Sequence, residues 1–185
     1  MNELFANTQD ALVFAFGYSA GQYPQSPMAQ MAKTGNVGSG KGLVSTAGAA
    51  QAGMIQSALS VMNSIKVQCL VARYAQQYTD CQCCGGRKPE KLWQEAIAAL
   101  SDWSMQFLAG SISHAVVREA IILNFFSRGV SINEAAERAH VPVKTAYNHR
   151  AKIHAALKEL DAQAQCEIAD LLERHGIVEK TAEIA

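Results

Sequence analysis

The feature that most constrains this fold is the short run from Ser131 to Pro142, which separates two helical patterns. It begins with Ser-Ile-Asn-Glu, in which the Ser131 hydroxyl and the Glu134 carboxylate suit the free backbone donors at the start of a helix. It ends at Pro142, which stops one helix and fits the first turn of the next. The sequence therefore predicts a short helix over 132–139, a tight turn, and a second helix directly behind the proline.

That second helix combines one apolar face with a basic remainder. Its apolar residues recur at helical spacing. The residues that we expect to face the core are Ala146, Ile153, Leu157 and Leu160. From His114 to Leu160, seven lysines and arginines stand against four acids, whereas six acids and two basic residues follow from Asp161 onward. A short helix, a tight turn and a basic helix are typical of a helix-turn-helix.

Polar side chains near the start of the second helix suit contacts with DNA. Asn148 can form two hydrogen bonds with adenine in the major groove, and Tyr147 suits either a base or a phosphate. Phosphate contacts position a helix without reading sequence. The residues that we expect to make them are Lys144, Thr145, Arg150 and Lys152. The alternative is a three-helix core piece whose polar face is merely solvated.

The run GVSINEAAERAHVPVKTAYNHRAKIHAAL resembles the helix-turn-helix of region 4 of sigma factors and of the response-regulator class of activators. The residues that match the pattern of those families are Ser131, Glu134, Ala136, Arg138, Val141, Thr145, His149, Ile153 and Leu157. The resemblance implies that Tyr147, Asn148 and Ala151 face base edges. It also implies that His149 has a structural role, and that the partner is double-stranded DNA.

Helical periodicity also dominates the chain from about Ser45 to Phe107. Apolar residues at spacings of three to five predict one long helix that reaches the cysteine motif. Pro89 then stands where a new helix can begin. The core face of that helix is expected at Leu92, Ile97, Leu100, Trp103 and Phe107. Alanine-rich composition without alternating runs favours helices over sheet. We therefore expect an all-α helical bundle with a cysteine knuckle between helices.

Three of the five cysteines lie in the sequence CQCCGG, which suits a metal or reduced thiols better than a disulfide framework. A C-x-x-C turn followed by glycine is typical of half a zinc knuckle. Cys81, Cys83 and Cys84 are therefore candidate ligands of Zn²⁺, and Cys69 or His114 is the candidate fourth ligand. The alternatives are reduced cysteines in a glycine-containing turn and a redox-sensitive site.

The order of elements over about residues 43–160 resembles the phage late-gene antitermination proteins of the Q type and related prophage DNA-binding proteins. The shared order is an AGAAQAGMI segment, a helix ending in ARYA, a cysteine knuckle and a C-terminal helix-turn-helix. The resemblance implies binding to DNA near a late promoter and to paused RNA polymerase with its sigma factor, which becomes insensitive to terminators. The alternative is an interaction module that binds polymerase or another protein, with little DNA affinity of its own.

The run GNVGSGKG, Gly35 to Gly42, matches the first seven positions of a phosphate-binding loop. No β-branched strand precedes it, and Gly42 stands where the Mg²⁺-binding hydroxyl is needed. We therefore expect no nucleotide. The glycine-rich tract from Gly17 to Gly42 instead predicts a flexible connector.

These patterns predict four parts. They are a flexible N-terminal arm over 1–44, a helical region with the cysteine knuckle over 45–112, the helix-turn-helix over 113–160, and an acidic C-terminal helix and tail over 161–185. The chain has no run of about 18 apolar residues and no basic residue before its first apolar stretch, so we expect a cytoplasmic protein without membrane contact. Hydrolase, paired-carboxylate and H-E-x-x-H arrangements are missing, so we expect no enzyme.

Overall fold

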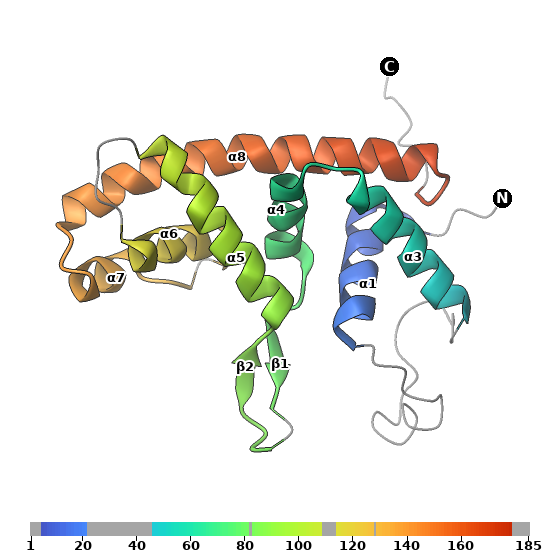
Figure 1. Ribbon diagram of the computed structural model, residues 1–185, viewed down its shortest axis with the longest axis horizontal. Coiled ribbons are helices and arrows are strands. Elements are labelled where there is room, and N and C mark those ends of the chain that lie inside the picture. The colour runs from blue at the N-terminus through green and yellow to red at the C-terminus, as the bar shows by residue number, and fades with distance from the viewer. Residues whose placement is uncertain (1–4, 22–45, 82, 109–113, 128, 179–185) are drawn as a thin grey trace. The chain divides into compact units, whose positions relative to one another are not determined.

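The computed structural model describes residues 5–21, 46–81, 83–108, 114–127 and 129–178. These residues are mostly helical and include one small two-stranded sheet (Figure 1). The elements in chain order are α1 (Thr8–Gly21), α3 (Thr46–Ser60), α4 (Ser64–Tyr74), β1 (Tyr78–Asp80), β2 (Arg87–Pro89), α5 (Lys91–Ser104), the 3-10 helix η1 (Met105–Phe107), α6 (Ala115–Ser127), α7 (Ile132–Arg138) and α8 (Val143–Arg174). The chain divides into two compact units.

The first unit holds α1, α3 and the end of α8 from Glu167 onward. Asn7 caps α1, because its Oδ1 accepts a hydrogen bond from the Asp10 amide at 2.8 Å. The α1 residues buried against the core are Ala11, Leu12, Ala15 and Phe16. The described part of the predicted N-terminal arm is thus a packed helix. Residues 22–45, which include GNVGSGKG, lie outside the described residues.

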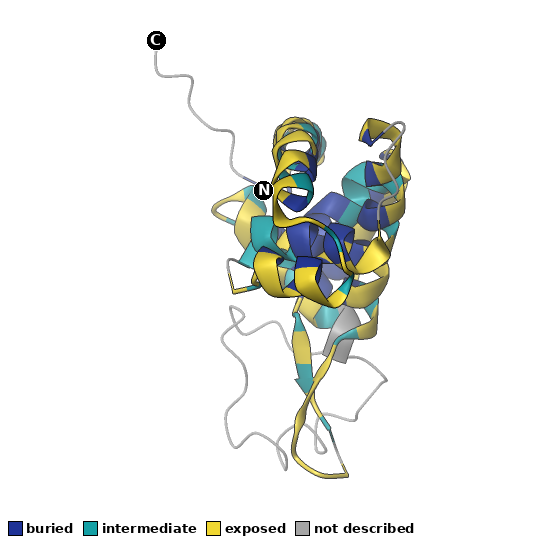
Figure 2. Ribbon diagram, turned by 90° about the vertical axis from the view of Figure 1, so that its left-hand side faces the viewer, coloured by how far each residue is buried: buried dark blue, intermediate teal, exposed yellow. Residues whose placement is uncertain are grey.

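The second unit holds α4, the two strands, α5, η1, α6, α7 and the part of α8 that ends at Cys166. Its largest fully buried side chains are Leu70, Leu100, Ile121, Ile122, Ile153 and Leu157. The buried residues gather where the helices pack, whereas the two strands are mostly exposed (Figure 2). Arg118 is buried as well, and its Nε donates to the Ser101 carbonyl at 3.1 Å, which joins α6 to α5.

The prediction of a single long helix ahead of the cysteines is wrong. The helix α3 ends at Ser60, and a separate helix, α4, begins at Ser64. Asn63 caps the new helix: its Oδ1 accepts from the Ile65 amide at 3.1 Å. Its carbonyl also accepts from the Lys66 and Val67 amides. An Asn-Ser pair is a common start of a helix, so the sequence carried a signal that the apolar periodicity concealed.

The cysteine motif also departs from the all-α prediction, because it joins two antiparallel strands and not two helices. Tyr78 pairs with Pro89, and Asp80 pairs with Arg87, next to the loop that holds the cysteines. Pro89 therefore ends β2, and α5 begins two residues later, after an extended residue, Glu90. Strands of three residues are too short to show a reliable alternation of polar and apolar positions.

The buried face of α5 is shifted from the predicted stripe. Ile97 and Leu100 are buried as expected, but Trp103 is half-buried and Phe107 is exposed. Trp93, which the stripe left out, is only 6% exposed.

Within the described ranges, no helix has both the length and the apolar character that a membrane span requires.

Candidate nucleic-acid interface and metal centre

The start of α7 shows the hydroxyl half of the predicted capping box. Ser131 has extended backbone angles, and its hydroxyl oxygen accepts a hydrogen bond from the Glu134 amide at 3.3 Å. The apolar residues of this short helix, Ile132, Ala135 and Ala136, are all buried. The cap fixes where α7 begins, and the buried apolar side holds the helix against the rest of the unit.

The turn between α7 and α8 depends on His140, whose φ of 53° is in the left-handed region. The His140 amide donates to the Glu137 carbonyl, and the Val141 amide donates to the Ala136 carbonyl at 2.9 Å. This pair of bonds is a Schellman motif, in which glycine is the preferred left-handed residue. The glycine that follows α6, Gly129, does not have this conformation, because it is not among the residues with positive φ.

Replacing His140 by glycine is expected to raise the free energy of unfolding by about 1 kcal/mol, because a left-handed side chain costs more than glycine loses in chain entropy. The end of α8 offers the reverse test. Gly176 has φ 65° in the same pattern of bonds, and no atom lies within 4 Å of an added Cβ. Gly176→Ala should therefore destabilise through the backbone alone. Urea denaturation measures both, and a destabilised H140G would contradict the strain at this turn.

The first turns of α8 present a narrow exposed stripe. The exposed residues that share it, at helical spacings of three and four, are Lys144, Tyr147, Asn148 and Ala151. The opposite side is buried through Ala146, His149 and Ile153. The base-reading candidates Tyr147, Asn148 and Ala151 thus lie together on one accessible face.

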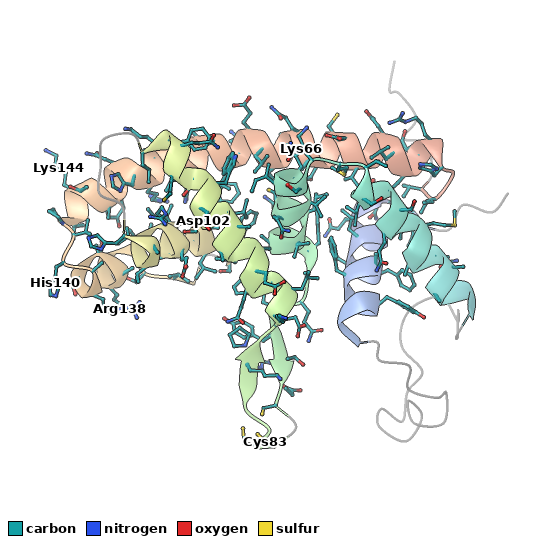
Figure 3. All side chains as sticks on the ribbon, in the orientation of Figure 1. Lys66, Cys83, Asp102, Arg138, His140 and Lys144 are labelled. Atoms are coloured by element: carbon teal, nitrogen blue, oxygen red, sulfur yellow. The ribbon has the colours of Figure 1, made fainter. Side chains whose placement is uncertain are left out.

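The other predicted DNA contacts surround this stripe. Lys152 is exposed, whereas Thr145 and Arg150 are half-buried. The Arg150 guanidinium lies 5.8 Å from the centre of the Tyr147 ring, which orients both side chains. Arg138 and His140, exposed at the end of α7, lie with Lys144 around the turn (Figure 3). Sequence reasoning did not single out Arg138 as a contact residue, although this last residue of α7 is exposed on the same surface.

Two histidines fix the other side of α8. His149 is only 4% exposed, and burial lowers its pKa. Burial also lowers the pKa of His154, against the opposing effect of the Ile121 carbonyl, to which Nε2 donates at 3.2 Å. Both rings are therefore held in their neutral form near neutral pH, as packing groups between α8 and its neighbours. This agrees with the structural role that the resemblance implies for His149.

The loop between β1 and β2 brings the three predicted metal ligands together. The Sγ atoms of Cys81, Cys83 and Cys84 all lie within 4.8 Å of one another, and those of Cys81 and Cys83 are 2.9 Å apart. Gly85, with φ 67°, donates its amide to the Cys81 carbonyl, and the Cys81 amide donates to the Gly86 carbonyl at 2.7 Å. The left-handed glycine thus folds the loop back so that the thiols meet.

The thiols differ in their affinity for protons. A hydrogen bond from the Cys83 side chain, with further bonds from backbone amides, lowers the pKa of Cys81 to about 7. The same thiol contact raises the pKa of Cys83. A cluster with one thiolate available at neutral pH is a suitable start for binding a soft cation.

The two candidates for a fourth ligand lie elsewhere. Cys69 is buried in α4, where burial and Asp161 raise its pKa to about 12, and its thiol points at the Asp161 carboxylate, 3.7 Å away. His114 precedes α6 and is exposed. Neither belongs to the group of three thiols. Among the described residues, this group contains no fourth ligand.

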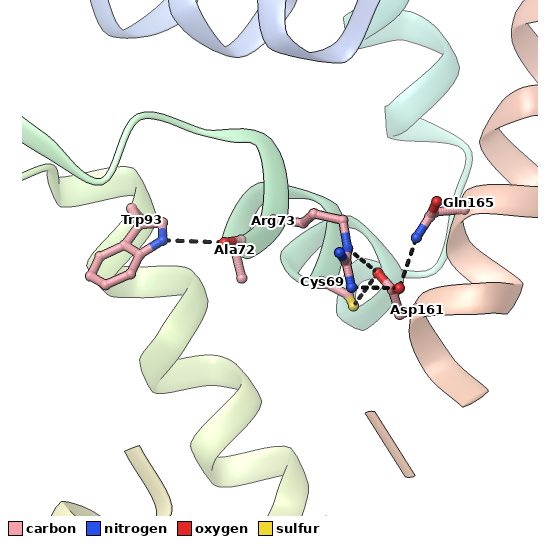
Figure 4. Close-up of polar contacts among 6 residues, drawn as sticks. All are labelled: Cys69, Ala72, Arg73, Trp93, Asp161 and Gln165. Atoms are coloured by element: carbon pink, nitrogen blue, oxygen red, sulfur yellow. Dashed lines mark hydrogen bonds and ion pairs between the residues drawn. The ribbon is translucent and has the colours of Figure 1, made fainter. Parts of the chain in front are cut away.

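Sequence reasoning missed the ion pair that joins α4 to α8. Asp161 Oδ1 and Oδ2 accept from Nε and Nη2 of Arg73, both at 2.7 Å, and Gln165 donates to Oδ2 (Figure 4). The Arg73 guanidinium also lies over the ring of Phe126, at 5.5 Å. Because 88 residues separate the two partners, no local sequence pattern predicts this ion pair.

No protein-family model, curated protein or solved structure matches this chain.

Proposed function

We propose that this protein is a sequence-specific DNA-binding regulator of transcription, in which α7, its turn and α8 act as a helix-turn-helix. The observation that carries the proposal is the exposed stripe of Lys144, Tyr147, Asn148 and Ala151 on a helix whose opposite side is buried. Such a helix can enter the major groove without loss of its packing. Asn148 then reads adenine, while Lys144 and Lys152 bind phosphates.

The charge around the stripe supports DNA as the partner. Within α8, no acidic residue precedes Glu159, so every charged side chain in its first four turns is positive. Arg138 and Lys144 add exposed positive charge beside the turn. Phosphate contacts of this kind release counterions, and the affinity should therefore fall steeply as salt rises.

Replacing Asn148 by alanine is expected to cost about 1–3 kcal/mol on the preferred duplex and to relax the choice of base at one position. Lys144→Ala should instead weaken all duplexes alike and reduce the salt dependence by about one counterion. Fluorescence anisotropy on a duplex selected from a random library measures both. Glu159→Ala, farther along α8, is the control. Unchanged binding by both N148A and K144A would contradict the assignment of α8.

A finer form of the proposal concerns antitermination. Its support is the order of elements shared with the phage late-gene antitermination proteins, and it adds RNA polymerase and its sigma factor as partners. Footprinting of the late promoter region with and without polymerase tests it, because a footprint that extends only when polymerase is present is expected. Association with polymerase but none with DNA alone would favour the interaction module.

The cysteine loop is proposed to bind Zn²⁺ through Cys81, Cys83 and Cys84. Thiolates are preferred ligands of zinc, and a bound ion would hold the loop between two strands that are too short to be stable alone. Metal analysis of protein purified under reducing conditions should find about one zinc per chain, lost on chelation. Cys83→Ser should remove it, whereas Cys166→Ser, on exposed α8, should not. A zinc content below about a tenth of an equivalent would contradict the site.

A further inference from the structure

The proposed zinc site lacks a fourth ligand within its own unit. All five cysteines and all five histidines belong to the described residues. In the unit that holds the loop, only Cys81, Cys83 and Cys84 come together, although Cys69, Cys166 and four of the histidines belong to that unit too. The undescribed residues contribute no cysteine or histidine. Structural zinc sites are almost always four-coordinate, so the missing ligand must come from elsewhere.

A second copy of the same loop can supply the missing ligands. Two loops supply six thiolates, and two zinc ions each reach four sulfur ligands when two of those thiolates are shared between the ions. A water molecule in the fourth position is instead typical of catalytic zinc. Among the described residues, no acid or histidine belongs to the group that the three thiols form.

The position of the loop permits this pairing. Cys83 and Cys84 are exposed, and Cys83 lies at the end of the hairpin, which projects from the start of α5 (Figure 3). The residues next to the loop carry both signs of charge, since Asp80 on β1 is paired in register with Arg87 on β2. Two copies related by a twofold axis can therefore place each acid beside the other copy's arginine. Both strands of the hairpin are largely exposed.

We propose that a second copy of this chain completes the metal site, so that zinc links two hairpin ends into a dimer. This inference rests on the zinc binding proposed above. It also gives the helix-turn-helix a consequence, because a symmetric dimer presents two copies of α8 to two half-sites of a DNA palindrome. Metal supply would then control DNA affinity through the number of half-sites that one particle can hold.

The test is the mass of the full chain in solution, measured by sedimentation in a phosphine reductant that does not bind zinc as a thiol would. The zinc-loaded protein is expected at twice the chain mass of 19.9 kDa, and the chelated protein at the single mass. Cys83→Ser and Cys84→Ser should remain single in zinc, whereas Cys166→Ser should pair like the unchanged chain. Circular dichroism checks that each variant keeps its helices.

Two results would overturn the inference. A protein that holds one zinc per chain at the single mass would show that the fourth ligand is water or belongs to the same chain. A dimer that survives chelation or the C83S substitution would show that another surface makes it. Either result leaves the zinc site itself standing, because the metal content is measured in the same samples. Binding of the monomer to DNA is measured separately, so a failure of the proposed regulator is distinguishable as well.

Discussion

Replacing Trp93 by alanine is expected to lower the free energy of unfolding by about 3–5 kcal/mol. The side chain is 6% exposed, and its Nε1 donates to the Ala72 carbonyl of α4 at 3.3 Å (Figure 4). Its ring also lies 6.2 Å from that of Tyr78 in β1. The substitution leaves a cavity where α4, α5 and the hairpin meet, and it leaves the Ala72 carbonyl without its donor.

A graded series separates these causes. Trp93→Phe keeps most of the apolar volume but removes the donor, so a loss of about 1–3 kcal/mol is expected. Trp103→Phe on the same helix is the matched control, because that ring is half-buried and contacts Phe107. Far-ultraviolet circular dichroism in urea measures all three, since fluorescence changes with the tryptophans themselves. A W93A protein within about 1 kcal/mol of the unchanged chain would contradict this role.

The second large effect is expected at Asp161, where alanine should cost about 2–4 kcal/mol. The carboxylate is 12% exposed and accepts both bonds of the Arg73 fork. Its removal leaves the Arg73 side chain, which is 33% exposed, without its carboxylate partner and over the rings of Phe125 and Phe126. The estimate lies below that for a fully buried pair because Arg73 is partly solvated.

A double substitution distinguishes the worth of the pair from the cost of leaving one charge unpaired. Arg73→Met with Asp161→Leu should recover much of the stability that D161A loses, because an apolar pair of similar volume leaves no buried charge. Asp102→Ala is the control, since that carboxylate is 81% exposed and lies 4.0 Å from Arg118. Equal losses in D161A and D102A, measured by urea denaturation, would refute the proposed importance of the α4 to α8 ion pair.

Local chemistry explains which parts of the site were predictable. Ser131 and Glu134 lie three residues apart, and Pro142 ends the turn, so the start of α7 and the start of α8 follow from neighbours along the chain. The three cysteines lie within four positions, and a single glycine turn suffices to gather them. Features of this range depend on interactions that a sequence displays directly.

Other features required partners distant in sequence or conformations that a pattern hides. The break before Asn63 was hidden because its flanking helices share one apolar periodicity. The turn itself was predicted at 140–142, but its left-handed conformation falls on a histidine, a residue type that seldom adopts it, so the sequence did not show that feature. The hairpin offered three residues on each side, too few for a period of two to be seen.

The sequence by itself thus determined a helical chain, the capped helix and turn before α8, and a three-thiol cluster, because each arises from contacts within a few residues. The exposed face of α8 also followed from its apolar spacing, whereas only the tertiary structure decided that Trp93 and not Trp103 fills the core, and that Arg73 meets Asp161. The reason is physical. Burial and ion pairing depend on which helices approach one another, and that choice is made by the packing of the whole unit.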